Sequence, residues 1–391
     1  MNDRHLAGMS EVTRLTRSGR LQEATAAIQR MLSGHHLAPV ANAPVKADKE
    51  PIEGSFRVER DEAYRASYAG HFQPASHRAR PVPRRARDAQ GQFITGSYAN
   101  EAGKRSYMLY VPSGYRGQSL PLVVMLHGCT QDPEDFAAGT RMNCVAEEHP
   151  CLVLYPAQAQ GANPSKCWNW FKEGDQRRDQ GEPSIVAGIT RRIMGSHNID
   201  PRRVYVAGLS AGGAMAVTMA RTYPDLYAAV GVHSGLAYAV AYDLPSAVAM
   251  MRQDPVAIGR VGIGGAGRLP MGERVIPTIV FHGDRDRTVH PLNGEQVITQ
   301  SLTVPCSGSE DAGTTSHVTV KRGQAANGHA YTRTIYHGED GQPSLEHWLV
   351  HGGGHAWSGG SSDGSFTDPK GPDATKEMIR FFWEHPQPAS Q

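Results

Sequence analysis

From Phe93 onward, the chain alternates short runs rich in Val, Leu, Ile and aromatic residues with longer runs of helical periodicity. This alternation is the strongest constraint on the fold, because parallel strands need a crossover connection, which is usually a helix. We therefore predict an α/β architecture for residues 93–391, with a mostly parallel sheet flanked by helices. The expected strands span residues 106–111, 122–126, 152–155, 204–207, 228–233, 278–281 and 345–350. The expected helices span residues 135–148, 184–194, 211–221 and 374–384, the last with Asp373 as its N-cap.

Two regions precede this domain. Residues 1–33 place apolar side chains at helical spacing with arginines on the other faces, which predicts a short amphipathic helical segment. Such a segment can dock on the main domain or on another subunit, or it can bind an interface between water and an apolar phase. Residues 34–92 are rich in Pro, Arg and Ala and lack periodicity, so we predict a linker.

The charge balance argues against a dedicated nucleic-acid binder. Lys and Arg total 40 and Asp and Glu total 38, so the chain lacks the basic excess of such proteins. The linker carries an arginine cluster, but prolines within it prevent a regular helical face and no aromatic residue alternates with the arginines. We interpret the cluster as solvated, with polyanion binding as the alternative. Its members are Arg78, Arg80, Arg84, Arg85 and Arg87.

Targeting signals and cysteines bear on where the chain works. No run approaches the roughly 20 apolar residues of a membrane span. The N-terminal region has no apolar block before a small-residue cleavage site, so we expect no conventional signal peptide. The 5 cysteines are too scattered for a disulfide scaffold, and their odd number leaves at least one free thiol. We expect a cytoplasmic location, and the sequence does not indicate an oligomeric state.

A G-x-S-x-G pattern, from Gly208 to Gly212, stands between an expected strand and an expected helix. The pattern alone is weak, because glycine is frequent in this chain. Its context is that of a nucleophile elbow, which needs a buried strand, a sharp turn of small residues and a helix whose N-terminus faces the reacting group. We therefore predict that Ser210 is a nucleophile.

A serine hydroxyl needs a base to take its proton and a carboxylate to orient that base. Asp284 and Asp286 both follow the expected strand 278–281, at the strand's carboxyl end, where sites in parallel sheets collect. Both therefore qualify as the carboxylate. The base is expected in a later glycine-rich stretch that can bring an imidazole over the serine. We favour His355, with His351 as the alternative, because a histidine at a strand end is often a hydrogen-bonded core residue.

Acyl transfer also needs two backbone donors for the oxyanion of the tetrahedral intermediate. The N–H of Ala211, directly after the nucleophile, is expected to be one. The second is expected from the loop after the strand 122–126, where the amide of Cys129 is our candidate. The Cys129 thiol itself fits a small buried hydrophobe or a disulfide partner.

Five segments form a combination that is more specific than any one of them. They are Leu126-His-Gly-Cys-Thr-Gln131, Asn163-Pro-Ser-Lys-Cys-Trp-Asn-Trp-Phe171, Gly208-Leu-Ser-Ala-Gly212, His282-Gly-x-x-Asp286-x-x-Val289 and Gly353-Gly-His-Ala-Trp357. Together they resemble the poly(3-hydroxybutyrate) depolymerase family of esterases, which is similar in fold and motif to feruloyl and acetylxylan esterases. The resemblance covers roughly residues 98–382 and implies an α/β-hydrolase fold.

The resemblance also implies roles for particular residues. They are Ser210, Asp286 and His355 for a catalytic triad, Cys129 and Ala211 for the oxyanion hole, and Trp168, Trp170 and Trp357 for substrate binding. The chemistry requires no metal and no organic cofactor. Relatives outside the cell can pair the cysteines equivalent to Cys129 and Cys167, although a reducing cytoplasm does not assure that bond.

The expected function is hydrolysis of short-chain polyhydroxyalkanoate esters, above all poly(3-hydroxybutyrate), through an acyl-enzyme. Secreted family members typically carry a signal peptide, a linker and an adsorption domain. Because we expect no conventional signal peptide here, we expect action on storage granules, with residues 1–33 touching the granule surface. A feruloyl or acetylxylan esterase acting on polysaccharide-linked esters is the first alternative. A non-catalytic granule-associated binding protein is the second. Residues 236–277, rich in Ala, Met and Gly, would form either a cap or a helical excursion that decides the substrate.

Overall fold

The computed structural model describes residues 56–60, 91–254, 276–302, 317–338 and 341–388. All of them belong to one compact unit, Gly54–Gln391. The amphipathic segment predicted at residues 1–33, most of the predicted linker and residues 255–275 of the expected cap lie outside the described residues. Within the range predicted as a linker, residues 56–60 form strand β1. The next described element is strand β2, which begins at Gln92.

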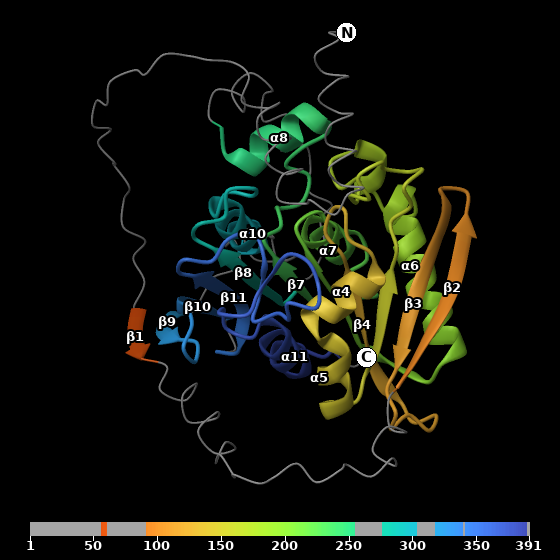
Figure 1. Cartoon of the computed structure of the whole chain (residues 1–391), viewed down its shortest axis with the longest axis horizontal. Coiled ribbons are helices and arrows are strands. Elements are labelled where there is room, and N and C mark those ends of the chain that lie inside the picture. The colour runs from red at the N-terminus through yellow and green to blue at the C-terminus, as the bar shows by residue number, and fades with distance from the viewer. Residues whose placement is uncertain (1–55, 61–90, 255–275, 303–316, 339–340, 389–391) are drawn as a thin grey trace. The chain divides into compact units, whose positions relative to one another are not determined.

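The centre of the fold is an 11-stranded sheet with the order β1-β9-β10-β11-β8-β7-β6-β4-β5-β3-β2 (Figure 1). Neighbouring strands from β11 through β5 pair in parallel, whereas β3 and β2 at one end and β9 and β10 near the other form antiparallel pairs. The strands are β1 (Phe56–Arg60), β2 (Gln92–Asn100), β3 (Gly103–Val111), β4 (Leu120–Leu126), β5 (Leu152–Pro156), β6 (Ile199–Leu209), β7 (Ala229–His233), β8 (Thr278–Gly283), β9 (His317–Gln324), β10 (Ala330–His337) and β11 (Pro343–Val350). Two short strands, β12 (Trp357–Ser358) and β13 (Thr367–Asp368), pair separately.

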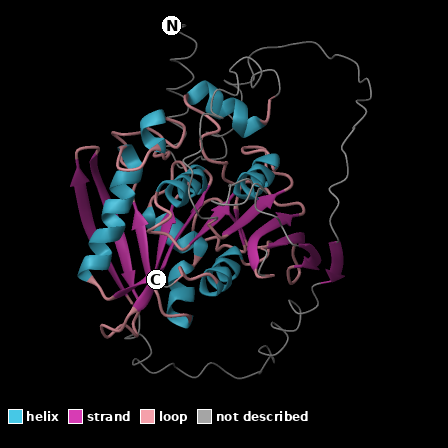
Figure 2. Ribbon diagram, turned by 180° about the vertical axis from the view of Figure 1, so that it is seen from behind, coloured by secondary structure: helices cyan, strands magenta, loops and turns pink. Residues whose placement is uncertain are grey.

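Helices cover both faces of this sheet (Figure 2). They are α4 (Pro133–Thr140), α5 (Met142–Glu148), α6 (Gly181–Ser196), α7 (Ala211–Thr222), α8 (Leu244–Arg252), α10 (Leu292–Leu302) and α11 (Ala374–Glu384), with a short 3-10 helix at Glu173–Gln176. Side chains of α6, α7 and α10 pack in one hydrophobic cluster, and those of α4, α5 and α11 pack in a second. Within the described ranges, no helix has the length and apolar character that a membrane-spanning segment requires.

Strand β4 shows why both faces need cover. Leu122 and Val124 belong to the first cluster, whereas Val123 and Met125 belong to the second, and all four are fully buried. Successive side chains of a strand point to opposite faces, so a continuous apolar run requires helices on both sides of the sheet. This is the doubly covered parallel sheet that the sequence predicts.

Each strand predicted from the sequence is present, with ends shifted by a few residues. The helix predicted at residues 135–148 is wrong as one element, because Arg141 adopts φ 54° and separates α4 from α5. Its N–H donates to Ala137 O and ends α4 in a left-handed cap. Asp373 caps α11 as predicted, since its Oδ1 accepts the N–H of Lys376 at 3.1 Å. Strands β2, β9 and β10 and helix α10 were not expected, whereas α8 lies within residues 236–277, for which a cap or a helical excursion was expected.

One edge of the sheet collects the residues predicted to be functional. The loops that carry Cys129, Ser210, Asp286 and His355 follow β4, β6, β8 and β11, respectively. These strands run in the same direction within the sheet. Their carboxyl ends therefore lie along one edge, which is where ligands bind in open α/β sheets.

Candidate active site

Ser210 occupies a sharp turn between β6 and α7. Its backbone angles are φ 57° and ψ −120°, outside the regions that residues with a side chain usually adopt. The N–H of Ser210 donates to His233 O at 2.9 Å, which ties the turn to the end of β7. The conformation is that of a nucleophile elbow, which presents the serine hydroxyl at the N-terminus of the following helix.

The two glycines of the G-x-S-x-G pattern allow this turn to form. A Cβ atom on Gly212 would lie 2.0 Å from Leu126 O, and one on Gly208 would lie 2.3 Å from Gly212 O. Both distances are far below van der Waals contact, so no other residue fits without displacing the backbone. The pattern thus reflects close packing of β6, α7 and the end of β4 around Ser210.

Asp286 is buried in the loop after β8 and is held from two sides. Its Oδ1 accepts the backbone N–H groups of Thr288 and Val289 at 2.8 and 2.9 Å. Its Oδ2 accepts the Nδ1–H of His355 at 2.7 Å. Burial opposes ionisation, but hydrogen bonds from His282 and His355 outweigh it and hold the pKa of Asp286 well below its usual value. The carboxylate is therefore charged and fixed in orientation.

His355 lies in the loop after β11, and its ring orientation follows from the bond to Asp286. Because Nδ1 donates to the carboxylate, Nε2 is the nitrogen that can accept a proton from a serine hydroxyl. Among the described residues, no hydrogen bond joins His355 Nε2 to Ser210 Oγ. Such bonds often tighten only when substrate is bound. The structure thus brings the acid and base into contact and places the serine on the same edge of the sheet.

Asp284 and His351, the alternatives from the sequence, form a second pair. Asp284 Oδ2 accepts the Nδ1–H of His351 at 3.0 Å, and Oδ1 accepts the backbone N–H of Gly352 at 2.7 Å. His351 Nε2 is 2.9 Å from the Thr332 hydroxyl on β10. Both nitrogens of His351 are therefore engaged, and this pair joins the loop after β8 to the loop after β11.

The loop expected to supply an oxyanion donor lies beside Ser210. A Cβ atom on Gly128 would lie 3.6 Å from the Ser210 Cβ. Neither the Cys129 N–H nor the Ala211 N–H has a hydrogen-bond partner within the described part of the chain. The Ala211 N–H is in the first turn of α7, where backbone donors have no partner within the helix. Both amides are thus free to donate, one directly after the serine and one in the loop beside it, as an oxyanion hole requires.

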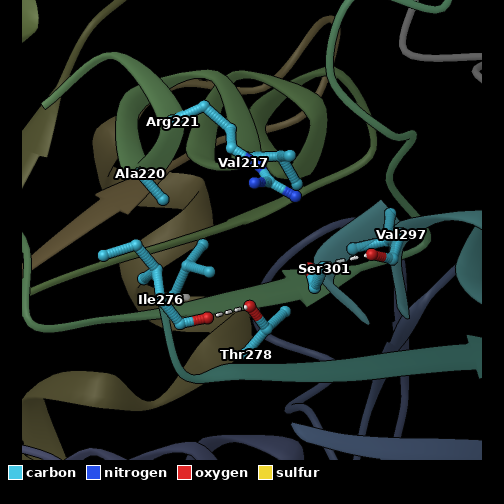
Figure 3. A pocket seen from close by; sticks show the side chains of 8 residues that line it. Val217, Ala220, Arg221, Ile276, Thr278, Val297 and Ser301 are labelled. Atoms are coloured by element: carbon cyan, nitrogen blue, oxygen red, sulfur yellow. Dashed lines mark hydrogen bonds between the residues drawn. The ribbon is translucent and has the colours of Figure 1, made fainter. Parts of the chain in front are cut away.

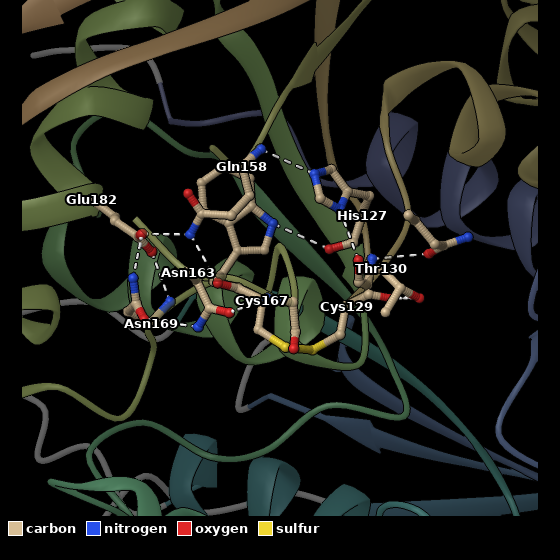
Figure 4. The surroundings of a disulfide bond; sticks show 12 residues. His127, Cys129, Thr130, Gln158, Asn163, Cys167, Asn169 and Glu182 are labelled. Atoms are coloured by element: carbon tan, nitrogen blue, oxygen red, sulfur yellow. Dashed lines mark hydrogen bonds between the residues drawn. A yellow bond between two sulfur atoms is a disulfide. The ribbon is translucent and has the colours of Figure 1, made fainter. Parts of the chain in front are cut away.

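A disulfide joins Cys129 to Cys167 and fixes this loop to the segment that carries Trp168 (Figure 4). Sequence reasoning left the state of this pair open, and the structure contains the bond. Cys144 and Cys151 are free thiols, as expected from the odd number of cysteines. Cys306 lies outside the described residues.

The tryptophans expected to bind substrate are buried instead. Trp168 is fully enclosed, and its Nε1–H donates to His127 O at 3.1 Å. Trp170 is also buried, and the ring of Trp357 stacks on His233 while its Nε1–H donates to Thr375. Their apolar faces pack within the core, and substrate binding by these rings stays a prediction. Trp168 instead supports the backbone of the oxyanion loop.

A buried carboxylate that the sequence analysis missed anchors the segment after β5. Glu182 accepts a hydrogen bond from Arg105 Nη2 at 3.0 Å. It also accepts the Asn169 N–H at 2.7 Å, and Figure 4 shows these two residues side by side. Burial and the nearby Glu182 raise the pKa of Asp175 to about 6. No short motif marks Glu182, because its partners come from distant parts of the chain. The network positions Trp168 and Cys167, and through them the Cys129 amide.

Two buried histidines also support the site. The N–H of Gln158 donates to His127 Nε2 at 3.1 Å, so His127 Nδ1–H donates to Gly128 O at 2.8 Å. Burial lowers the pKa of His127 to about 4 and that of His233 to about 3. His233 Nε2 accepts the N–H of Ser358 at 2.9 Å and so anchors the segment just after His355. Both imidazoles are neutral structural groups near pH 7.

A pocket between α7, β7, β8 and α10 lies at the other edge of the sheet (Figure 3). Val230 and Thr278, which line it, stand at the amino ends of β7 and β8. Arg221 also lines it and donates to Gln300 O at 2.7 Å. The pocket is therefore remote from Ser210. No cluster of three or more potential metal ligands occurs in the residues that the structure describes.

The parallel sheet, the serine elbow after β6 and the His–Asp contact after β8 and β11 together define an α/β-hydrolase-fold protein. Comparison with family models gives the more particular assignment. The model described as Esterase PHB depolymerase matches residues 105–322, so the chain belongs to that family. The match includes Cys129, Ser210 and Asp286 and ends before His355.

The relatives found by sequence are named for different ester substrates. The chain is 36% identical over 208 residues to poly(3-hydroxyalkanoate) depolymerase C of Paucimonas lemoignei, covering 52% of this chain and 49% of that protein. It is 31% identical over 149 residues to feruloyl esterase B of Neurospora crassa, covering 38% and 49%. It is 26% identical over 216 residues to acetylxylan esterase A of Talaromyces purpureogenus, covering 52% and 54%. The chain thus spans about half the length of these relatives.

A solved structure supports the fold. The acetyl xylan esterase from Aspergillus awamori superposes with a TM-score of 0.52 at 20% sequence identity. The superposition covers 74% of this chain and 99% of that one. This similarity confirms the predicted α/β-hydrolase fold.

Proposed function

We propose that this protein is a serine esterase that hydrolyses short-chain polyhydroxyalkanoate esters, with poly(3-hydroxybutyrate) as the substrate. The observation that carries the proposal is the 2.7 Å hydrogen bond from His355 Nδ1 to the buried Asp286 carboxylate, on the same sheet edge as Ser210. A histidine oriented by a buried carboxylate beside a serine elbow is the arrangement that acyl transfer requires.

In the proposed mechanism, His355 Nε2 takes the proton of Ser210 as its Oγ attacks the ester carbonyl carbon. Asp286 stays ionised, holds the Nδ1–H tautomer and stabilises the imidazolium that forms. The amides of Cys129 and Ala211 donate to the oxyanion, since both are free to do so. His355 then protonates the departing alcohol. Water attacks the acyl-enzyme in the same way and releases the acid.

The choice of polyester rests on family membership and on a relative named for that activity. Feruloyl and acetylxylan esterases also match, so hydrolysis of polysaccharide-linked esters is the second candidate. A binding protein without catalysis is the third. The intact set of Ser210, Asp286 and His355 argues against it.

The proposed site of action is the storage granule. The Cys129–Cys167 disulfide counts against the expected cytoplasmic location, because such bonds persist mainly in oxidising compartments. Cytoplasmic location and granule contact by residues 1–33 therefore stay predictions.

The test is release of 3-hydroxybutyrate from amorphous poly(3-hydroxybutyrate) granules, with a soluble butyrate ester measured in parallel. Ser210→Ala is expected to lower both rates by at least about 10³-fold, because the variant lacks the hydroxyl that forms the acyl-enzyme in the proposed mechanism. Ser301→Ala, a buried serine of α10 at the remote pocket, is the matched control and should keep both activities.

Each outcome has a separate meaning. Turnover of the soluble ester without release from granules would keep Ser210 as nucleophile and shift the substrate to feruloyl or acetyl esters. No turnover of any ester by folded protein would contradict an enzymatic role and favour the binding protein. Equal activity of wild type and Ser210→Ala would overturn the triad.

A further inference from the structure

A second histidine lies against the Asp286 carboxylate. His282, on β8, is fully buried, and its Nε2 is 3.4 Å from Asp286 Oδ2. That oxygen is the one that accepts the Nδ1–H of His355 at 2.7 Å. Asp286 Oδ2 therefore stands between two imidazoles. The proposed mechanism uses only one of them.

The surroundings of His282 locate its proton. Its Nε2 is also 2.9 Å from the carbonyl oxygen of Val289, so both neighbours of this nitrogen are acceptors. The Nδ1 atom is buried and has no hydrogen-bond partner. The structure thus offers acceptors to a proton at Nε2 and none at Nδ1. The Nε2–H is directed into the narrow space between the Val289 carbonyl and the Asp286 carboxylate.

The packing around Nδ1 keeps the ring in that orientation. A Cβ atom on Gly294, in α10, would lie 3.0 Å from His282 Nδ1 and 3.1 Å from His347 Nε2. The Nε2 atom of His347, which lies on the adjacent strand β11, is likewise buried without a hydrogen-bond partner. Its register partner is Val280, so both histidines project from the same face of the sheet beneath α10. The missing side chain at position 294 leaves room for both rings, and the close helix backbone restricts their rotation.

The titratable groups that interact with His282 come from three places. Asp286 lies on the following loop, His233 on β7 and His347 on β11. Burial lowers the pKa of His233 to about 3 and that of His347 to about 4. Above about pH 5, Asp286 is therefore the charged member among these neighbours. The anionic acceptor for an Nε2–H of His282 is therefore Asp286 Oδ2.

The geometry points to His282 as a positioning residue for the reaction, whose Nε2–H acts as a second donor to Asp286 Oδ2 and limits rotation of that carboxylate so that it faces His355. The inference rests on the proposed function of Ser210, Asp286 and His355. His282 does not contact substrate in this scheme. It shares the negative charge of Asp286 with His355 and so moderates how strongly the imidazolium is stabilised.

The test compares two substitutions of different chemistry. The amide nitrogen of His282→Gln can donate from nearly the position of Nε2, whereas His282→Leu keeps much of the volume and loses the donor. In the soluble-ester assay, we expect His282→Leu to lower kcat by about 10- to 100-fold with KM nearly unchanged, because a misplaced acid and base act on the chemical step. His282→Gln should recover most of that loss.

The pH profile separates positioning from packing. Without the second donor, the negative charge of Asp286 is no longer shared and stabilises the His355 imidazolium more strongly, even though the carboxylate is less well aligned for proton transfer. The acid limb of kcat/KM should therefore move to higher pH in His282→Leu. His347→Leu is the matched control, since it removes a buried imidazole beneath Gly294 that does not touch Asp286. It should leave the acid limb in place. Equal losses in both His282 variants, with no shift of the limb, would overturn the inference.

A spectroscopic measurement keeps this test independent of activity. In ¹⁵N-labelled protein, the imidazole correlations should identify His282 as carrying its proton at Nε2. A proton at Nδ1 would contradict the inference even in a protein with full esterase activity. A protein that shows the Nε2 tautomer but cleaves no ester would instead contradict the proposed function.

Discussion

Two His–Asp pairs join the same two loops of this molecule and differ in their surroundings. In the first, His355 and Asp286 are 2.7 Å apart, and their side chains are 12% and 0% exposed. In the second, His351 and Asp284 are 3.0 Å apart, with exposures of 40% and 33%. The acids are two residues apart in the chain and the histidines four. The same functional groups therefore occur once inside the protein and once at its surface.

The difference shows that the environment, rather than the pairing, defines the candidate active site. Asp286 faces two imidazoles and two backbone amides, so its charge is held in one direction. Asp284 faces one imidazole and the Gly352 amide, and water screens the rest. His351 has its second nitrogen engaged by Thr332, whereas the Nε2 atom of His355 has no hydrogen-bond partner among the described residues and is free to accept a proton. The inner pair is suited to catalysis and the outer pair to joining loops.

The largest expected effect is on activity. Asp286→Asn should lower kcat by about 10⁴-fold, because an amide no longer enforces the required tautomer of His355. Asp284→Asn should change kcat by at most about fivefold, as expected for an exposed pair worth about 0.2–1 kcal/mol. The measurement is steady-state hydrolysis of a soluble butyrate ester by both variants.

Folding controls are needed for this pair of variants. Circular dichroism and the urea midpoint should show that both remain native under assay conditions. Comparable losses in the two variants would remove the distinction between the inner and outer pairs. A larger loss in Asp284→Asn would reassign the acid.

The second effect concerns stability against acid. The pKa of Asp286 in the folded protein is lower than in the unfolded chain, because the hydrogen bonds from His282 and His355 outweigh burial. Its contribution is therefore complete above the unfolded value of about 3.9 and is lost as pH falls toward the folded value. We expect Asp286→Asn to lower the free energy of unfolding by about 1–3 kcal/mol at pH 7. The difference from wild type should shrink between about pH 4 and pH 2.

Urea unfolding at several pH values measures this dependence. The pKa of Asp284 is also lowered, since bonds from Gly352 and His351 outweigh its partial burial, so its variant should show the same sign with smaller size. A gap between wild type and Asp286→Asn that widens on acidification would contradict the assignment of Asp286 as the more strongly held carboxylate.

Local sequence signals predicted the parallel sheet and the serine elbow because both depend on neighbouring residues. Strand β4 is an uninterrupted apolar run, and Gly208 and Gly212 are required by contacts within a few residues or across one strand. Asp284 and Asp286 could not be separated by spacing alone, since both follow β8. They differ in the histidine that contacts each of them from the loop after β11, His355 for Asp286 and His351 for Asp284, and these contacts form only in the folded chain.

The buried tryptophans show the other limit of sequence reasoning. A motif identifies Trp168 and Trp357 as near the site but does not say which way each ring faces. Trp168 lies in a segment that is held by the Glu182–Asn169 hydrogen bond and by the Cys129–Cys167 disulfide, and Trp357 stacks on His233. Both rings therefore fill the interior. Similarly, the half-exposed strands β9 and β10 have weak alternation and were not expected. Long-range contacts decide these features.

The smallest expected effect tests whether the outer pair holds the loop that carries His355. Asp284 Oδ1 accepts the Gly352 N–H, so Asp284→Ala should increase hydrogen exchange of that amide, by about fivefold for an interaction worth about 1 kcal/mol. Asp284→Asn keeps an acceptor oxygen and should retain most of the protection, which makes it the matched control. If Asp284→Ala left exchange at Gly352 unchanged, the outer pair would not restrain this loop. If it raised exchange and lowered kcat only slightly, the inner pair would be sufficient to orient His355 even when its loop is less restrained.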